Sequence, residues 1–202
     1  MGLKLSYTLL APIYDSIVGS STQEMRLNSL KRIDIKTSQH VLINGIGTGL
    51  DLPFLPDNHR YTATDLTPAM LEKCKSRLSQ YDLDIELHTA DVMRLPFEDN
   101  SFDIVLMNLI LAVVPEPIKA LQEASRVLKP GGKIFIMDKF IRPGQLAPTR
   151  RLLNVFIRHI ATRTDVVFEH LLESCPELIL TNDKPAMMSG WFRFIDLEKT
   201  DK

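Results

Sequence analysis

The stretch VLINGIGTGL, residues 41–50, constrains the fold more than any other part of the chain. An apolar run leads directly into three glycines at alternate positions, Gly45, Gly47 and Gly49. Glycine adopts positive φ at little cost and lets the backbone approach a ligand closely. The pattern therefore predicts a buried strand over residues 40–44 that ends in a tight ligand-binding turn.

The spacing of these glycines disfavours two common nucleotide sites. The dinucleotide fingerprint G-x-G-x-x-G requires glycine at position 50, where this chain has Leu50. No Gly-Lys-Ser/Thr follows the turn, so it is not a phosphate-binding P-loop. A glycine-rich turn that merely joins a strand to a helix remains the alternative interpretation.

Segments of strand and helix character alternate along the rest of the chain. Further strands are predicted at 61–65, 85–88, 102–107 and 133–137, with helices at about 67–81, 116–128 and 147–173. Strands alternating with helices pair in parallel through right-handed crossovers. Residues 177–181 and 190–197 have no helix between them, which predicts a closing antiparallel hairpin. We therefore expect an α/β fold, a doubly wound and mostly parallel seven-stranded sheet with helices on both faces.

Length and composition set the remaining bounds. A chain of 202 residues suits a single domain. The net charge of −1 gives no overall attraction to nucleic acid. The two cysteines, Cys74 and Cys175, suit a reducing cytoplasm, and no apolar run is long enough to predict a membrane-spanning helix. Residues 21–24 have the capping-box pattern of a helix start.

Two carboxylates follow the second and third predicted strands. Ligands of doubly wound sheets bind at the carboxyl ends of the strands, and an acid such as Asp65 can accept both hydroxyls of a ribose there. The alternative is an acid that favours the next helix N-terminus. Asp91 could accept a hydrogen bond from an exocyclic amine, with Val92 or Leu66 packing on a base, or could be a solvated loop residue. Together with the glycine turn, these residues predict a pocket for adenosine that lacks a diphosphate-binding pattern.

On these residues the chain resembles the class I S-adenosylmethionine-dependent methyltransferases. VLINGIGTG is similar to the first motif of that family, TATDLTPAML to the second and TADVMRLPFEDNSFDIV to the third. NLILAVVPEPIKALQEASRVLKPGG is similar to the segment that follows. The resemblance covers about residues 38–140 in the right order and spacing. Within the type 11 methyltransferases it is greatest to ubiquinone/menaquinone methyltransferases and bacterial phosphatidylethanolamine N-methyltransferases, whose Y…APxYD opening matches residues 7–15.

The resemblance implies S-adenosylmethionine as the cofactor and S-adenosylhomocysteine as the product. It implies that the cofactor is bound by Gly45, Gly47, Gly49, Asp65, Leu66, Asp91, Val92 and Asn108. Asn108, at the end of the fourth strand, would lie by the methionine moiety; the alternative is a residue that caps the strand. Tyr14 would belong to an N-terminal segment that folds over the cofactor, or else is a packing tyrosine.

The chain departs from the family at Ile43. This position usually carries Asp or Glu, which helps to hold the amino group of the cofactor. Isoleucine cannot accept a hydrogen bond, and neighbouring Asn44 should point to the opposite face of the sheet. The loss of one charge-assisted hydrogen bond costs about 1.5–3 kcal/mol, or about ten- to hundredfold in affinity. The alternative function is therefore a degenerate cofactor-binding module that acts as a partner or regulatory subunit.

The candidates for a catalytic base are weak. Methyl transfer from a sulfonium is a direct displacement, so the protein mainly positions the acceptor and the methyl group. An amine acceptor must be unprotonated, and a phenol profits from a base. The candidates are Tyr14, Asp138 at the end of the fifth strand, and His159. No histidines have metal-ligand spacing, so we expect no metal.

The segment 139–164 indicates the type of substrate. It holds six lysine and arginine residues and no acid, interleaved with apolar residues. A basic amphipathic helix over 147–162 could lie on an anionic membrane, whereas the alternative is a lid packed on its own domain. We expect a hydrophobic small-molecule acceptor, either a phospholipid amine headgroup or a quinone-type ring, and nucleic acid is disfavoured as a partner. Residues 1–35 would form an N-terminal helical lid, and 139–175 a helical substrate lid.

Overall fold

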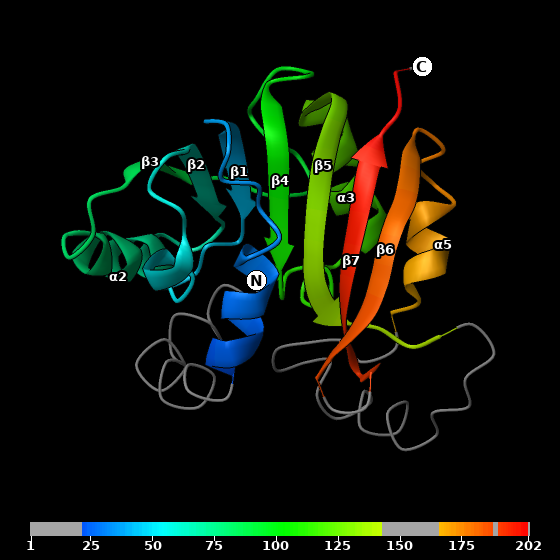
Figure 1. The fold of residues 1–202 in the computed structure, drawn as a ribbon, viewed down its shortest axis with the longest axis horizontal. Coiled ribbons are helices and arrows are strands. Elements are labelled where there is room, and N and C mark those ends of the chain that lie inside the picture. Colours follow the sequence, from blue (N-terminus) through cyan, green and yellow to red (C-terminus); the bar gives the residue numbers. More distant parts are fainter. Residues whose placement is uncertain (1–21, 143–165, 188–189, 202) are drawn as a thin grey trace.

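The computed structural model describes residues 22–142, 166–187 and 190–201. They form a seven-stranded sheet with the strand order β3-β2-β1-β4-β5-β7-β6 (Figure 1). In chain order the elements are a helix over 22–30, β1 His40–Asn44, η1 Leu52–Phe54, β2 Arg60–Asp65, α2 Pro68–Leu78, β3 Asp84–Thr89, β4 Phe102–Asn108, α3 Pro117–Val127, β5 Leu128–Lys139, α5 Phe168–Leu172, β6 Leu178–Met187 and β7 Phe192–Lys199. The predicted α/β sheet is confirmed.

The directions of the strands determine where a ligand site is expected. Strands β3, β2, β1, β4 and β5 pair in parallel, and β7 is antiparallel to both β5 and β6. The C-terminal hairpin is therefore confirmed. The chain leaves β1 toward β2 on one side and returns to β4 on the other, so the strand order reverses between β1 and β4. Ligands of such sheets bind outside the carboxyl ends of the strands at this point.

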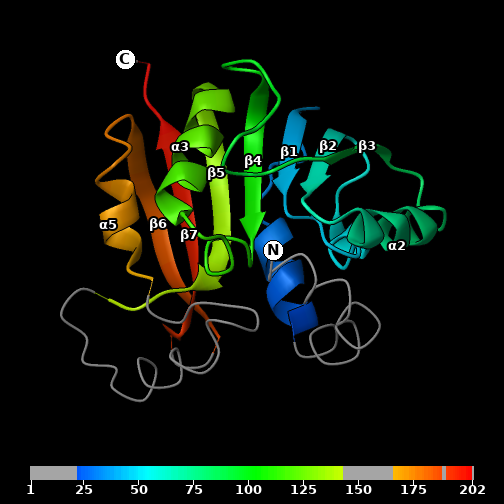
Figure 2. The ribbon, with the colours of Figure 1, turned by 180° about the vertical axis from the view of Figure 1, so that it is seen from behind.

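Two apolar cores cover the two faces of the sheet. Leu42 and Val105 lie on the face that packs under α3 and α5 (Figure 2). Ile43 and Leu106 lie on the other face, under the helix over 22–30 and α2 (Figure 1). Successive side chains of a strand point to opposite faces, so β1 and β4 are apolar on both sides because both sides are buried.

Some predicted boundaries shift. The helix predicted to reach about residue 81 ends at Leu78. Strand β5 begins at Leu128, five residues early, because Phe102 already pairs with Leu128 before Ile104 pairs with Lys133. The extra residues form an irregularity in which Gly131 has φ +72°.

The two predicted lids are described only in part. The first contributes the helix over 22–30, while residue 21 and those before it lie outside the described residues. The second contributes the end of β5 and α5, since 143–165 lie outside as well. No helix in the described ranges is long and apolar enough to cross a membrane.

Candidate active site

A cavity of about 180 Å³ lies at the carboxyl ends of the parallel strands. Its walls come from the segments that follow β1, β2, β3 and β4. The lining residues are Gly45, Gly47, Asp65, Leu66, Thr67, Met70, Ala90, Asp91, Val92, Met93, Leu109, Ile110, Val113, Val114 and Pro115. Six of the eight cofactor residues predicted from the sequence are therefore brought together here, and Gly49 and Asn108 are not among them.

The glycine turn after β1 adopts the conformation that its sequence demands. Gly45, Gly47 and Gly49 have φ of +77°, +59° and +81°, where side chains are rarely tolerated. A Cβ on Gly45 would lie 2.7 Å from Ile110, whereas one on Gly47 would meet nothing within 4 Å. Gly47 therefore leaves open space for a ligand at the cavity wall. A Cβ on Gly49 would collide with Leu52 and Cys74, so Gly49 serves packing of the turn.

Asp65 connects the glycine turn to the end of β2. Its Oδ2 accepts a hydrogen bond from the Gly47 N–H at 3.0 Å, and its Oδ1 accepts one from the Thr67 N–H at 2.8 Å. Burial raises the pKa of this carboxyl group, while the two N–H donors act in the opposite direction. Each oxygen keeps a further lone-pair direction, because a carboxylate accepts about four hydrogen bonds in all. Asp65 can therefore receive the hydroxyls of a ribose without losing its backbone partners.

The segments after β2 and β3 give the cavity apolar lining beside a second carboxylate. Asp91 Oδ1 accepts the Met93 N–H at 2.9 Å, which fixes the turn after β3. Val92 is buried and Leu66 is 37% exposed, and both line the cavity. An apolar wall beside a carboxylate with spare acceptor capacity suits a purine with an exocyclic amine.

The segment after β4 contributes residues that sequence reasoning missed. Leu109 has φ +58°, which is uncommon for a residue with a side chain, and its N–H donates to the Met137 carbonyl at 2.7 Å. This conformation turns the chain so that Leu109 and Ile110 line the cavity. The sequence NLIL gives no sign of a left-handed residue, so only the structure reveals this turn.

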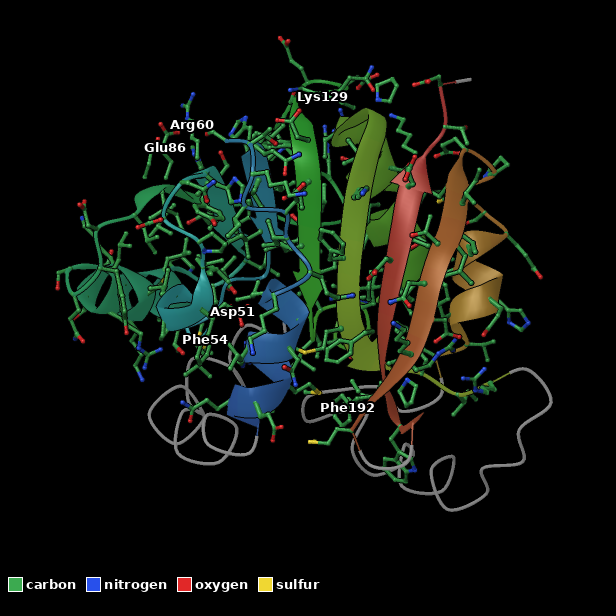
Figure 3. The ribbon with its side chains drawn as sticks, in the orientation of Figure 1. Asp51, Phe54, Arg60, Glu86, Lys129 and Phe192 are labelled. Carbon is green, nitrogen blue, oxygen red and sulfur yellow. The ribbon has the colours of Figure 1, made fainter. Side chains whose placement is uncertain are left out.

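Asn108 points away from the cavity lining into a buried polar cluster. Its Oδ1 accepts the Ser29 hydroxyl at 2.9 Å, and its Nδ2 donates to Asp51 Oδ2 at 3.2 Å. Asp51 Oδ1 in turn accepts Arg26 Nη1 at 2.7 Å, with both side chains less than a tenth exposed. Figure 3 shows Asp51 beside the helix over 22–30. Sequence analysis did not single out Arg26 or Asp51.

Ile43 and Asn44 point to opposite faces, as the strand period predicts. Ile43 is 1% exposed within the core under the helix over 22–30. Asn44 is fully buried, and its Oδ1 accepts the Thr64 hydroxyl at 3.3 Å. Within the described residues, its Nδ2 has no partner. Asn44 therefore cannot replace a carboxylate at position 43.

Of the three weak catalytic candidates, only Asp138 lies in the described residues. It is fully buried, and its oxygens accept the N–H groups of Ala112 at 3.0 Å and Lys139 at 2.8 Å. Burial raises its pKa to about 6. These bonds hold the segment after β4 in place from within the core. Tyr14 and His159 lie outside the described residues, and no group of three or more potential metal ligands occurs among those that are described.

The sheet order and the glycine turn together define a Rossmann-like nucleotide-binding architecture. The sequence profile of a methyltransferase domain family matches residues 42–136. A phosphatidylethanolamine N-methyltransferase of Cereibacter sphaeroides is 28% identical over 190 residues, which cover 93% of each chain. Residues 42–136 therefore match a methyltransferase domain, and these similarities support an S-adenosylmethionine-dependent methyltransferase.

Two further similarities differ in extent. A demethylmenaquinone methyltransferase of Paenarthrobacter aurescens is 35% identical over 133 residues, 63% of this chain and only 51% of its own. Phospholethanolamine N-methyltransferase 2 of Haemonchus contortus, solved with phosphomonomethylethanolamine and S-adenosylhomocysteine, has a TM-score of 0.76 at 19% identity. That match covers 96% of this chain and 58% of the other, and it supports the fold alone.

Proposed function

We propose that this enzyme binds S-adenosylmethionine in the cavity at the ends of β1 to β4 and transfers its methyl group to a phospholipid amine headgroup. The observation that carries the cofactor assignment is the Asp65 carboxylate. It is fixed by the Gly47 N–H beside open space and faces a mostly apolar wall. A quinone-type ring is the second candidate acceptor.

The residues present fit the cofactor. Asp65 would hold the ribose diol, since both of its oxygens keep acceptor capacity. Asp91 would accept the adenine amine, with Val92 and Leu66 packing on the ring. Gly47 would let the backbone approach the sugar, because no side chain occupies that wall. No diphosphate-binding pattern is needed for such a ligand.

Bound S-adenosylmethionine supplies an activated methyl group on a sulfonium, so the chain has little covalent chemistry to do. Its residues would bring the acceptor into line and exclude water. An amine acceptor must lose its proton before attack. Asp138 is enclosed in the core and bonded to two backbone N–H groups, so we assign it to positioning the segment after β4.

The amine acceptor is favoured over the ring by the extent of similarity. The phosphatidylethanolamine N-methyltransferase matches 93% of this chain and of itself. The demethylmenaquinone methyltransferase matches only 51% of itself, so about half of it has no counterpart in the alignment. A match that spans 93% of both chains also includes the segments outside the 42–136 domain, and we therefore give it more weight.

The acceptor can be tested with methyl-labelled S-adenosylmethionine and two sets of vesicles. One set contains phosphatidylethanolamine in phosphatidylglycerol, and the other contains demethylmenaquinone in the same lipid. We expect label in mono- and dimethylated phosphatidylethanolamine. Label in the quinone alone would transfer the proposal to the ring, and label only in water-soluble products would contradict both. Tight cofactor binding without turnover on any acceptor would favour the alternative, a binding module.

We further propose a cytoplasmic enzyme that contacts the membrane peripherally through the basic helix over 147–162, with 1–35 and 139–175 as lids. At the edge of the described structure, Arg142 and Trp191 are both well exposed, as is common near a membrane interface. Vesicle flotation should show binding to phosphatidylglycerol vesicles that weakens between 0.05 and 0.5 M salt, roughly as charge screening predicts. Equal flotation with neutral vesicles would contradict an electrostatic contact.

A further inference from the structure

The buried polar cluster beside the glycine turn has no role in the adenosine pocket. It joins Arg26 of the helix over 22–30, Asp51 of the segment after the turn and Asn108 at the end of β4. Thr22 and Ser29 complete it: Arg26 Nε donates to Thr22 at 3.0 Å, and Ser29 donates to Asn108 at 2.9 Å. Burying an ion pair is costly unless its partners are satisfied, so a buried pair next to a ligand site needs a reason.

The cluster lies on the face of the sheet where the absent acid would act. Ile43 pairs with Leu106 in the register of β1 and β4, and Asn108 follows Leu106 by two residues on β4. Residues two apart on a strand share a face. Ile43, Leu106 and Asn108 therefore point the same way. Asp51 is bonded to Asn108 and therefore lies on the face of the sheet to which an acid at residue 43 would point.

We propose that the Arg26–Asp51 ion pair receives the amino-acid end of the cofactor, Asp51 its ammonium group and Arg26 its carboxylate, in place of the acid absent at position 43. This inference rests on the proposed cofactor. It predicts that the contacts to the amino-acid end of the cofactor are made by other residues of the site and have not been lost.

The hydrogen-bonding capacity of the pair fits this ligand. The Asp51 carboxylate has accepted one bond at each oxygen, from Arg26 and from Asn108, and retains about two further acceptor positions. Arg26 uses Nε and Nη1, and among the described residues no acceptor meets its Nη2. The side chains are only 8% and 4% exposed, so a charged ligand group that meets them does so in a setting from which water is largely excluded. A zwitterion is neutral overall, as the pair is, so binding would add one cation and one anion to matching partners.

Two ligands separate this role from simple stabilisation. S-adenosylhomocysteine carries the amino-acid end, and 5′-methylthioadenosine has the same adenosine and sulfur without it. Titration calorimetry of the full chain should show tighter binding of S-adenosylhomocysteine. Asp51→Asn should weaken S-adenosylhomocysteine binding at least about tenfold while changing 5′-methylthioadenosine binding less than about twofold. The ratio of the two affinities is therefore the readout.

The matched control is Asp196→Asn. Asp196 of β7 pairs with Arg32, and the two side chains are 17% and 14% exposed. Asp196 lies across from Phe135, which belongs to the same core as Ile43, so the pair is on the same face of the sheet. This variant should lower the melting temperature and leave the affinity ratio unchanged. If Asp51→Asn does not fold because Arg26 is left buried and unpaired, the double variant Arg26→Gln with Asp51→Asn removes both charges and should give the same loss of ratio.

The outcomes are distinct. If the wild-type chain binds neither ligand, the proposed function fails and this inference fails with it. If it binds both ligands equally, or if neither variant changes the ratio, the cofactor assignment stands and the role of the ion pair is overturned. An equal loss for both ligands in the Asp51 variants would show a purely structural cluster and would also overturn the inference.

Discussion

The Gly47 N–H donates a hydrogen bond to Asp65 Oδ2 at 3.0 Å, so the turn after β1 and the end of β2 are one unit. The same carboxylate accepts the Thr67 N–H through its other oxygen. The side chain is thereby fixed before any ligand arrives. Preorganisation of this kind lowers the ordering cost of binding.

We expect Asp65→Asn to weaken binding of S-adenosylhomocysteine and of 5′-methylthioadenosine alike, by about tenfold or more. The amide keeps only one acceptor oxygen, so one backbone N–H and the ribose diol lose their partner. Titration calorimetry measures both affinities. The control is Asp103→Asn, because Asp103 pairs with Lys129 at the far end of the sheet from Asp51 (Figure 3). Unchanged 5′-methylthioadenosine binding would show that Asp65 does not hold the ribose.

Gly47→Ala and Gly49→Ala should differ in their main effect: the first should weaken cofactor binding, and the second should destabilise the fold. Both glycines have positive φ, so both substitutions carry a similar backbone cost of about 1–2 kcal/mol. The new methyl at 47 enters open space at the cavity wall and should weaken cofactor binding. At 49 it would lie 2.7 Å from Leu52 and 2.9 Å from Cys74, which should add about 1–3 kcal/mol of destabilisation.

Urea denaturation and titration calorimetry of both glycine variants separate the two effects. A Gly49→Ala protein that is as stable as Gly47→Ala but binds the cofactor less well would contradict the packing role of Gly49. It would instead support the cofactor-binding role that the family resemblance implies for this glycine.

His59 should make the fold sensitive to mild acid. Burial lowers its pKa below the ordinary 6.5; its Nδ1 accepts the Gln39 N–H, and among the described residues its buried Nε2 has no partner. The unfolded chain then binds the proton more readily than the folded one. The free energy of unfolding is therefore undiminished above pH 6.5, and it decreases as the pH falls from 6.5 through the folded-state pKa of His59. His59→Asn keeps an acceptor for Gln39, and its urea midpoint should fall less between pH 7.5 and 5.5; an identical fall would contradict this.

Ile43→Glu should have effects that depend on Asp51. In the wild-type chain it buries a second carboxylate beside Asp51, which should destabilise the fold by about 3 kcal/mol or more and give no gain in affinity. In the Asp51→Asn background the new acid restores one negative charge on that face, so S-adenosylhomocysteine binding should recover in part. Thermal unfolding and calorimetry of the four proteins measure both effects. Tighter binding in the wild-type background would show that no other residue takes the role of an acid at position 43.

The cavity lining beside the glycine turn could be predicted from the sequence because each of its parts is local. The glycine spacing, Asp65 and Asp91 each follow a strand directly, and parallel strands bring their carboxyl ends to one edge. Leu109 was missed, since no residue preference indicates that a leucine will adopt positive φ. Its conformation is held from outside by the Met137 carbonyl of the neighbouring strand.

The sequence alone therefore determined the sheet, the glycine turn and the carboxylates that line the cavity, because hydrophobic period and glycine spacing act over a few residues. Only the tertiary structure decided which polar residues lie on the face of the sheet to which Ile43 points. Arg26, Asp51 and Asn108 are 25 and 57 residues apart along the chain, and packing of the helix over 22–30 on the sheet brings them within hydrogen-bonding distance. No local pattern encodes such a contact, since its energy arises only when the two layers close and water is excluded.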